Sequence, residues 1–451
     1  MENLQEDVLT LILSKLEDLS DLCSCAGVAK FFHRLHWPVL VLRRTHHDEE
    51  RMARLVIGAL SSRHMNGLQK LVIKSEQENI GVEKKDWLML KKSQGSLRTL
   101  ELNGCFNVPD LWGVIHGFPK LSILKLKNNA FRTPRSTLPI SLPGLTTVSI
   151  IKSYYINDIQ ALVRACRASL ETLRVECESH IETMDLSITD CPKLEELVIE
   201  GLPENKVIVE GCSKLEGLSF TWELELWEID KLRNNHLYSI LSACPMLQTL
   251  QLSGGEALKS PVVISCPTIT SLNYARKDSR CPDFHDQLLL EPHVLRIECP
   301  SLQKLKISGD CCVVADFDVN IPEVTIAERW GYQNVKKVLC LSKSVLHLDI
   351  SKLNMRAEDY ARQSPGKSEI RLSVFYQLLQ ESLELRSIRM DLGDPHETAP
   401  IQKFLSSFFI AHPCLESVTT STNYWEALQE IKRPDFYCEK KSEDHVVIHR
   451  A

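Results

Sequence analysis

The sequence contains no long hydrophobic run and no large excess of either charge. Nowhere in its 451 residues do about 18 uncharged apolar residues follow one another, the minimum for a helix that crosses a bilayer. Its 53 Lys and Arg residues against 59 Asp and Glu residues give a formal net charge of -6. Binding to a phosphate backbone usually requires a dense positive excess. We therefore expect no membrane span and no nucleic-acid partner.

Several short motifs are absent as well. The acidic residues Glu2, Glu6 and Asp7 stand where a secretory signal would carry positive charge, and no Asn-x-Ser/Thr glycosylation acceptor occurs. The 16 cysteines include no CxxC pair, and neither a GxSxG nor an HExxH motif is present. We expect a cytoplasmic or nuclear protein with free thiols, without a metal site, a cofactor or catalytic residues.

What the sequence does contain is a repeated six-residue pattern whose first, fourth and sixth residues are apolar. The first copies begin at Leu68, Leu97, Leu121, Leu145, Leu170 and Leu194. Later copies begin at Leu215, Leu247, Ile269, Leu302, Ile321, Val345 and Leu385, and a degenerate copy begins at Leu415. The intervals from Leu97 to Leu194 are 24, 24, 25 and 24 residues, within the range of about 20 to 29 that is typical of leucine-rich repeats.

The pattern predicts one short strand in each copy. The last two apolar positions are two residues apart, so a strand turns both of them inward and turns the residues beside them outward. One such strand cannot bury its apolar face alone, but parallel stacking of neighbouring copies creates a continuous core. We therefore predict an α/β fold, a curved leucine-rich-repeat solenoid with parallel strands on its concave face and helices or irregular segments outside. Helical spacing of apolar residues predicts outer helices over 157–166 and 229–244.

Many of the cysteines share one place in the repeat, just before the strand. Those followed by proline at this place are Cys191, Cys244, Cys266 and Cys299. Phe118 and Leu142 occupy the equivalent place in other copies, and neither side chain can bind a metal. A position that accepts Cys, Phe or Leu is predicted to be an apolar packing site.

The segment before the repeats, residues 4–42, has the apolar spacing of three short helices. It resembles an F-box through Leu4, Glu6, Asp7, Val8, Leu9, Ile12, Leu16, Asp21, Leu22, Cys25, Ala26, Val28, Ala29, Lys30, Phe31 and Trp37. It departs from that family at Gln5, where a proline is common, and at Phe31, where a tryptophan is common. The resulting division is an F-box over 1–45, the repeats over 46–425, and a tail or capping segment over 426–451.

The resemblance to F-box proteins with leucine-rich repeats implies a non-catalytic subunit of an SCF-type ubiquitin ligase. In that family the F-box binds a Skp-type adaptor, and through it a cullin, while the repeats bind the protein to be ubiquitinated. Residues that match the adaptor-binding positions of the motif are Leu4, Val8, Leu9, Ile12, Leu16 and Leu22. An alternative role for these residues is to pack the helices together. An alternative for the whole chain is an interaction scaffold whose helical N-terminus caps the solenoid.

The variable strand positions build the face on which a protein substrate would lie. Charged candidates on this face are Lys125, Lys127, Arg174, Glu176, Glu200, Lys304 and Lys306. No single sign of charge dominates, and an ordinary solvated surface is the alternative interpretation for most of them. A small-molecule co-receptor would need a pocket and a basic cluster for polyphosphate, and the sequence shows neither clearly.

Overall fold

The computed structural model describes the chain in segments. These are residues 39–44, 67–75, 80–81, 95–106, 115–129, 141–152, 159–177, 186–201, 207–221, 234–254, 262–276, 294–309, 311–315, 321–330, 332–341, 345–355, 379, 384–390, 398–430 and 436–450. The predicted three-helix F-box over 1–45 lies outside the described residues except for its last part.

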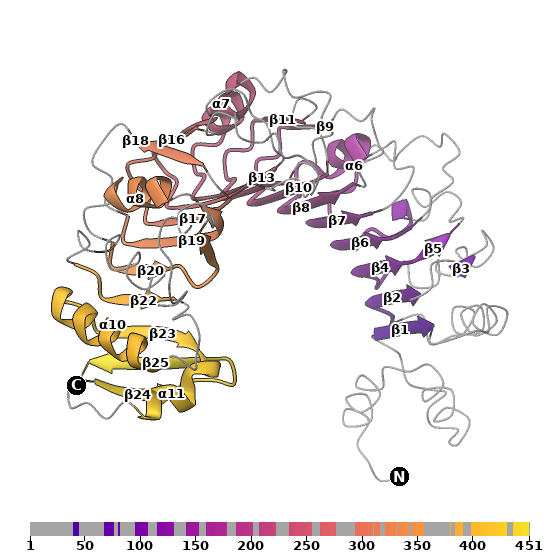
Figure 1. Ribbon diagram of the computed structural model, residues 1–451. Coiled ribbons are helices and arrows are strands. Elements are labelled where there is room, and N and C mark those ends of the chain that lie inside the picture. The colour runs from indigo at the N-terminus through magenta and orange to yellow at the C-terminus, as the bar shows by residue number, and fades with distance from the viewer. Residues whose placement is uncertain are drawn as a thin grey trace, which may run out of the picture. The chain divides into compact units, whose positions relative to one another are not determined.

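The described residues form a mixed α/β structure that is mostly strands with few helices and contains long parallel sheets (Figure 1). The chain divides into two compact units. The first comprises residues 1–219 with 243–245, and the second comprises 220–242 with 246–451. Among the described residues, no helix has both the length and the apolar character that a membrane crossing requires.

The main sheet of the first unit is parallel, and its strands pair in the order in which they occur along the chain. The strands are β1 (Val39–Arg44), β2 (Lys70–Ser75), β4 (Thr99–Asn103), β6 (Ile123–Lys127), β7 (Thr147–Ile151), β8 (Thr172–Glu176) and β10 (Glu196–Glu200). Strand β12 (Gly217–Thr221) follows at the boundary between the units. From β2 onward, each strand covers the end of one six-residue copy, as the pattern predicted.

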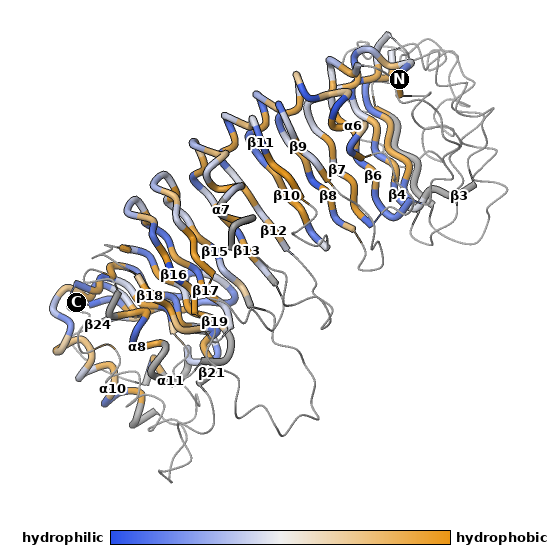
Figure 2. The backbone as a smooth tube through the Cα atoms, turned by 90° about the horizontal axis from the view of Figure 1, so that it is seen from above, coloured by the Kyte–Doolittle hydropathy of each residue, from blue (hydrophilic) through white to orange (hydrophobic). Residues whose placement is uncertain are grey.

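The strand register explains the periodicity of the sequence. It aligns the fourth residues of the copies in one row, Leu100, Leu124, Val148, Leu173 and Leu197. It aligns the sixth residues in a second row, Leu102, Leu126, Ile150, Val175 and Ile199. All of these side chains are buried, and Figure 2 shows the hydrophobic and hydrophilic positions alternating along the strands. The core is therefore a stack of leucine, valine and isoleucine rows beneath the sheet.

An outer layer covers this core in the first unit. Helix α6 (Ile159–Cys166) confirms the helix predicted over 157–166, and it buries Ile159, Leu162, Val163 and Cys166. It packs against β9 (Leu186–Thr189), which pairs in parallel with β11 (Val207–Glu210). Figure 1 shows α6, β9 and β11 on the same side of the main sheet. A smaller parallel pair joins β3 (Ile80–Gly81) to β5 (Cys105–Phe106).

The second unit repeats this plan with more helices. Its main sheet contains β13 (Thr249–Gly254), β15 (Ser271–Arg276), β17 (Lys304–Ser308), β19 (Glu323–Trp330), β20 (His347–Asp349), β21 (Leu353–Met355), β22 (Ser387–Arg389) and β23 (Ser417–Ser421), all paired in parallel. A second parallel sheet contains β14 (Val262–Ser265), β16 (Val294–Glu298) and β18 (Cys312–Ala315). Its described helices include α8 (Tyr332–Leu341), α10 (Thr398–Ala411) and α11 (Trp425–Glu430), and a 3-10 turn, η8 (Thr422–Tyr424), precedes α11.

Helix α7 (Asn234–Ala243) lies within the range 229–244 that the sequence predicted to be helical. Ile240 and Leu241 are buried in it, and Leu232 lies outside the described residues. The helix ends just before Cys244 and Pro245, because proline cannot continue a helix.

The two ends of the described chain differ from the simple division made from the sequence. Strand β1 lies within 1–45, the range predicted for the F-box, and pairs in parallel with β2. At the other end, 426–451 contains the strands β24 (Phe436–Lys440) and β25 (His445–Arg450). They form an antiparallel hairpin, and β25 also pairs antiparallel with β23. The parallel sheet therefore ends in a hairpin.

The cysteines that precede strands are packing residues, as their exchange with Phe and Leu predicted. Cys191, Cys244 and Cys299 are fully buried. Cys266 is also buried, as are Phe118 and Leu142 at the equivalent place. The cysteines whose side chains the structure describes carry free thiols.

Left-handed residues follow several of the strands. In the main sheet of the first unit these are Gly104, Asn128, Lys152 and Gly201, and in its outer layer Asp190 and Gly211, each one residue beyond a strand end. The N–H of Gly104, Asn128 and Lys152 donates to the carbonyl of the last residue of the next strand, at 2.8 to 2.9 Å. The positive φ thus extends the parallel hydrogen-bond ladder by one step before the chain turns away.

Candidate protein-binding surface

The face of each main sheet opposite the core carries polar side chains. Burial alternates along the strands, so that in β6 Leu124 and Leu126 are buried while Lys125 and Lys127 are exposed. The structure places all seven charged candidates at such outward positions. Lys125, Lys127, Arg174, Glu176 and Glu200 lie in the first unit, and Lys304 and Lys306 lie on β17 in the second. The candidates therefore form two sets on two units.

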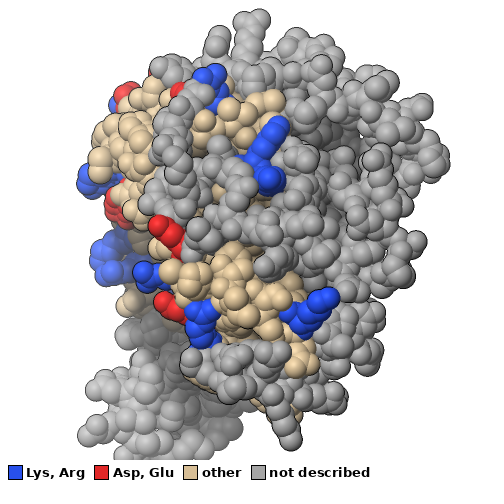
Figure 3. All heavy atoms as spheres, turned by 60° about the vertical axis from the view of Figure 1, so that its left-hand side comes forward, with Lys and Arg blue, Asp and Glu red and all other residues tan. Residues whose placement is uncertain are grey.

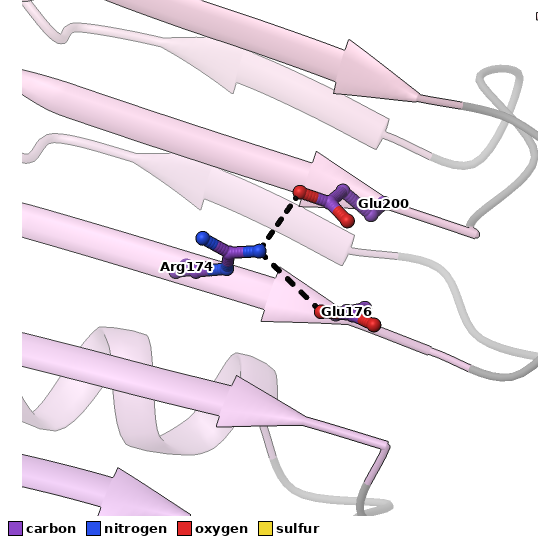
Figure 4. Close-up of polar contacts among 3 residues, drawn as sticks. All are labelled: Arg174, Glu176 and Glu200. Carbon is purple, nitrogen blue, oxygen red and sulfur yellow. Dashed lines mark hydrogen bonds and ion pairs between the residues drawn. The ribbon is translucent and has the colours of Figure 1, made fainter. Parts of the chain in front are cut away.

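Arg174, Glu176 and Glu200 form one cluster on β8 and β10 (Figure 4). The Nη2 atom of Arg174 donates to Oε1 of Glu200 at 3.1 Å and to Oε2 of Glu176 at 3.5 Å. The register places Glu176 directly opposite Glu200, and like charges at such positions repel each other. The guanidinium between the two strands offsets that repulsion. Half-exposed ion pairs of this kind contribute little to stability, about 0 to 1 kcal/mol.

The lysines of β6 differ from Arg174 in having no ion-pair partner among the residues that the structure describes. Glu101 lies opposite Lys125 in the register, but its Oε1 atom is paired with Nζ of Lys74, at 3.2 Å. Among the described residues, no carboxylate lies within ion-pair distance of Lys125 or Lys127. Both ammonium groups are therefore accessible to a partner.

In the second unit, the Nζ atom of Lys304 lies 2.8 Å from Oε2 of Glu323 on the next strand. Lys306 is exposed and lies in register with the uncharged residues Asn273 and Thr325. On the face drawn in Figure 3, the described Lys and Arg side chains are spread among uncharged and acidic residues. This arrangement is that of a solvated surface with charges of both signs, consistent with the absence of a dominant sign in the sequence.

The second unit also presents residues that the sequence analysis did not select. Nδ1 of His347 lies 2.7 Å from Oγ of Ser387 on the neighbouring strand. Arg389 is hydrogen-bonded to His445 of the hairpin, and the ring of His449 stacks on that of Tyr437 with centroids 5.0 Å apart. His347 and Arg389 occupy variable positions of repeat copies, so the pattern itself could have revealed them. The residues of the hairpin lie outside the repeat.

Several of the described cysteines have raised thiol pKa values, which makes them poor nucleophiles. Burial raises the pKa of the Cys166 thiol to about 12, and burial likewise raises that of Cys299 to about 11. A hydrogen bond with Cys212, together with burial, raises the pKa of Cys191. Because the thiolate is the reactive form, these groups stay inert near neutral pH.

Binding sites for metals or small molecules are not prominent in the part of the chain that the structure describes. Its His, Cys, Asp and Glu side chains form no group of three or more that could hold a metal ion. A cavity of about 150 Å³ lies beside Ile115, Phe118 and Leu145. It is smaller than the roughly 300 to 1,000 Å³ typical of ligand pockets. The outward sheet faces are therefore the better candidates for recognition.

A scan against models of protein families finds no match to this chain, and a search of curated proteins finds no similar sequence. The predicted adaptor-contacting residues Leu4, Val8, Leu9, Ile12, Leu16 and Leu22 lie outside the described residues.

Proposed function

We propose that the chain is the substrate-recognition subunit of an SCF-type ubiquitin ligase in the cytoplasm or nucleus. Its F-box would bind a Skp-type adaptor and, through it, a cullin. The repeats would form a leucine-rich-repeat solenoid that binds the protein to be ubiquitinated. The chain itself would catalyse no step.

The observation that carries the proposal is the regular outward face of the parallel sheets. Strands joined by backbone hydrogen bonds about 4.8 Å apart hold their outward side chains at fixed positions. Because these side chains are already held in place, the sheet loses little conformational entropy when a partner binds. This preorganisation favours affinity. The F-box resemblance of residues 4–37 adds the second half of the proposal, a site for an adaptor.

The adaptor site is tested by replacing apolar residues of the predicted first helix with charged ones. The double variant Leu9→Asp/Ile12→Asp should lose co-purification of a Skp-type adaptor, because a buried carboxylate opposes an apolar contact. The control Ser14→Asp adds a charge at a polar position of the same predicted helix and should retain the adaptor. Circular dichroism of both variants should match that of the parent chain. Unchanged co-purification with the double variant would remove the ligase assignment.

The alternative is an interaction scaffold whose N-terminal helices cap the repeats. It is favoured by β1, because this strand overlaps the end of the segment predicted to be helical and pairs with β2 of the main sheet. Deleting residues 1–38 leaves β1 intact and separates the two roles. A chain that aggregates or melts at much lower temperature would support the cap. A chain that stays folded but no longer binds an adaptor would support the ligase subunit.

A further inference from the structure

The register sorts the charges on the outward face of the first unit by strand. Strands β2, β4 and β6 present four positive and one negative side chain, a net +3, namely Lys70, Lys74, Lys125, Lys127 and Glu101. Strands β8 and β10 present one positive and three negative side chains, a net -2, namely Arg174, Glu176, Glu196 and Glu200. Between them β7 presents only Thr147, Ser149 and Ile151. A face with little total charge is thus divided into a basic half and an acidic half.

The two halves are far enough apart to act separately. Parallel pairing places β4, β6, β7 and β8 side by side, with β10 beyond β8. With about 4.8 Å between strands, β4 lies about 17 Å from the middle of the β8 and β10 pair. The Debye length at physiological ionic strength is about 8 Å. A bound charge above one half therefore responds mainly to that half.

Each half contains charged side chains that form no ion pair with another described residue. Lys125 and Lys127 are exposed, and no described carboxylate pairs with them. Glu196 is exposed as well and pairs with no described basic group. Arg174, in contrast, is engaged by Glu176 and Glu200 (Figure 4). Its pairing with both leaves the acidic half with excess negative charge.

We propose that this face binds a protein segment whose own charges are segregated, with acidic residues over β2 to β6 and basic residues over β8 and β10. The inference rests on the proposed function in one respect, that the repeats bind a protein partner. It then specifies the class of segment that the first unit accepts. A uniform polyanion such as a nucleic acid is disfavoured, because the acidic half would repel it.

The test uses the full chain and two synthetic peptides of equal composition. One carries a block of glutamates, an uncharged spacer of about five residues and a block of arginines, and the spacer spans the neutral strand. The other alternates the same charged residues. Fluorescence anisotropy at low and physiological salt should show the segregated peptide binding roughly tenfold tighter than the alternating one. Equal affinities would overturn the proposal.

Reversing the charge of the two lysines on β6 tests whether the peptide binds to this face. The variant Lys125→Glu/Lys127→Glu should weaken the segregated peptide roughly tenfold. It should also strengthen binding of a peptide that carries arginines at both ends, because both halves of the face are then acidic. Unfolding of the variant could not produce such a gain in affinity. The matched control Lys193→Glu changes an exposed lysine in the turn before β10 and should leave both affinities unchanged. Equal effects of the control and the double variant would refute the location.

The result can be separated from that of the adaptor test. A chain that co-purifies with an adaptor but binds both peptides equally overturns the charge-segregated partner and leaves the ligase proposal standing. A chain that binds the segregated peptide selectively but no adaptor overturns the ligase proposal and leaves this surface standing.

Discussion

Gly201, directly after β10, offers a sharp test of how the strand ends are built. Its φ is +78°, and a Cβ atom placed on it would lie 2.1 Å from the carbonyl oxygen of Cys177. That oxygen belongs to the backbone just after β8 and cannot move alone, because the neighbouring Cys177 N–H donates to the Glu200 carbonyl at 2.8 Å. Gly201→Ala therefore introduces two separate penalties.

The size of the effect follows from these two penalties. A left-handed conformation costs a residue with a Cβ about 1 to 2 kcal/mol. Relief of the contact with Cys177 requires a backbone shift that costs about 1 to 3 kcal/mol, as overpacking does elsewhere. We expect Gly201→Ala to lower the free energy of unfolding by about 2 to 5 kcal/mol. Gly201→Asn should also destabilise but by less, because asparagine tolerates the left-handed region while keeping the Cβ contact.

The assay is urea unfolding followed by circular dichroism. The matched control is Gly217→Ala, since a Cβ there would approach other atoms no closer than 3.9 Å, an ordinary contact. This control should leave the midpoint unchanged or raise it slightly, because alanine has less backbone entropy to lose than glycine. Equal midpoints for Gly201→Ala and Gly217→Ala would refute the requirement for glycine after β10.

Two further predictions concern stability. Lys152 holds a left-handed φ of 45° after β7, so Lys152→Gly should raise the free energy of unfolding by about 0.5 to 1 kcal/mol in the same urea assay, and a decrease would contradict it. Because burial raises the thiol pKa of Cys166 from 9.0 to about 12, the unfolded state ionises first as pH rises above 9. Stability should therefore fall between pH 9 and 12, and less so in Cys166→Ala; equal falls would exclude this thiol as a contributor.

The main sheets could be predicted from the sequence because their signal is strong. Each copy places two inward residues in a fixed register with the next, as Leu124 and Leu126 do with Val148 and Ile150. Helix α6 was predictable for the same reason, since its apolar residues recur at helical spacing.

The second strand layer was missed although a weak signal was present. Residues such as Leu186 and Ile188 in β9, or Leu295 and Ile297 in β16, alternate with polar residues just before a strand-preceding cysteine. These strands are only four or five residues long, and so short an alternation also occurs in loops. Parallel pairing with the same segment of the next copy makes them strands.

The candidate surface was predicted in part. Alternation alone identifies Lys125 and Arg174 as outward residues, because their neighbours are the inward ones of the pattern. The contacts of Arg174 with Glu176 and Glu200 depend on side-chain conformation, which the pattern does not determine. The pairing of Arg389 with His445 required knowledge that the C-terminal hairpin folds back beside β23.

The hairpin β24–β25 also limits how this protein can be lengthened. A parallel array grows by adding a turn to a strand that still offers a free edge in the same direction. Here β23 gives its outer edge to β25, which runs the opposite way. Additional turns could therefore enter by duplication within the array, for instance of the 24-residue turn between Leu121 and Leu145, and not by extension past β23. For protein engineering, the internal turns are therefore the units to duplicate, and the hairpin should be left unchanged.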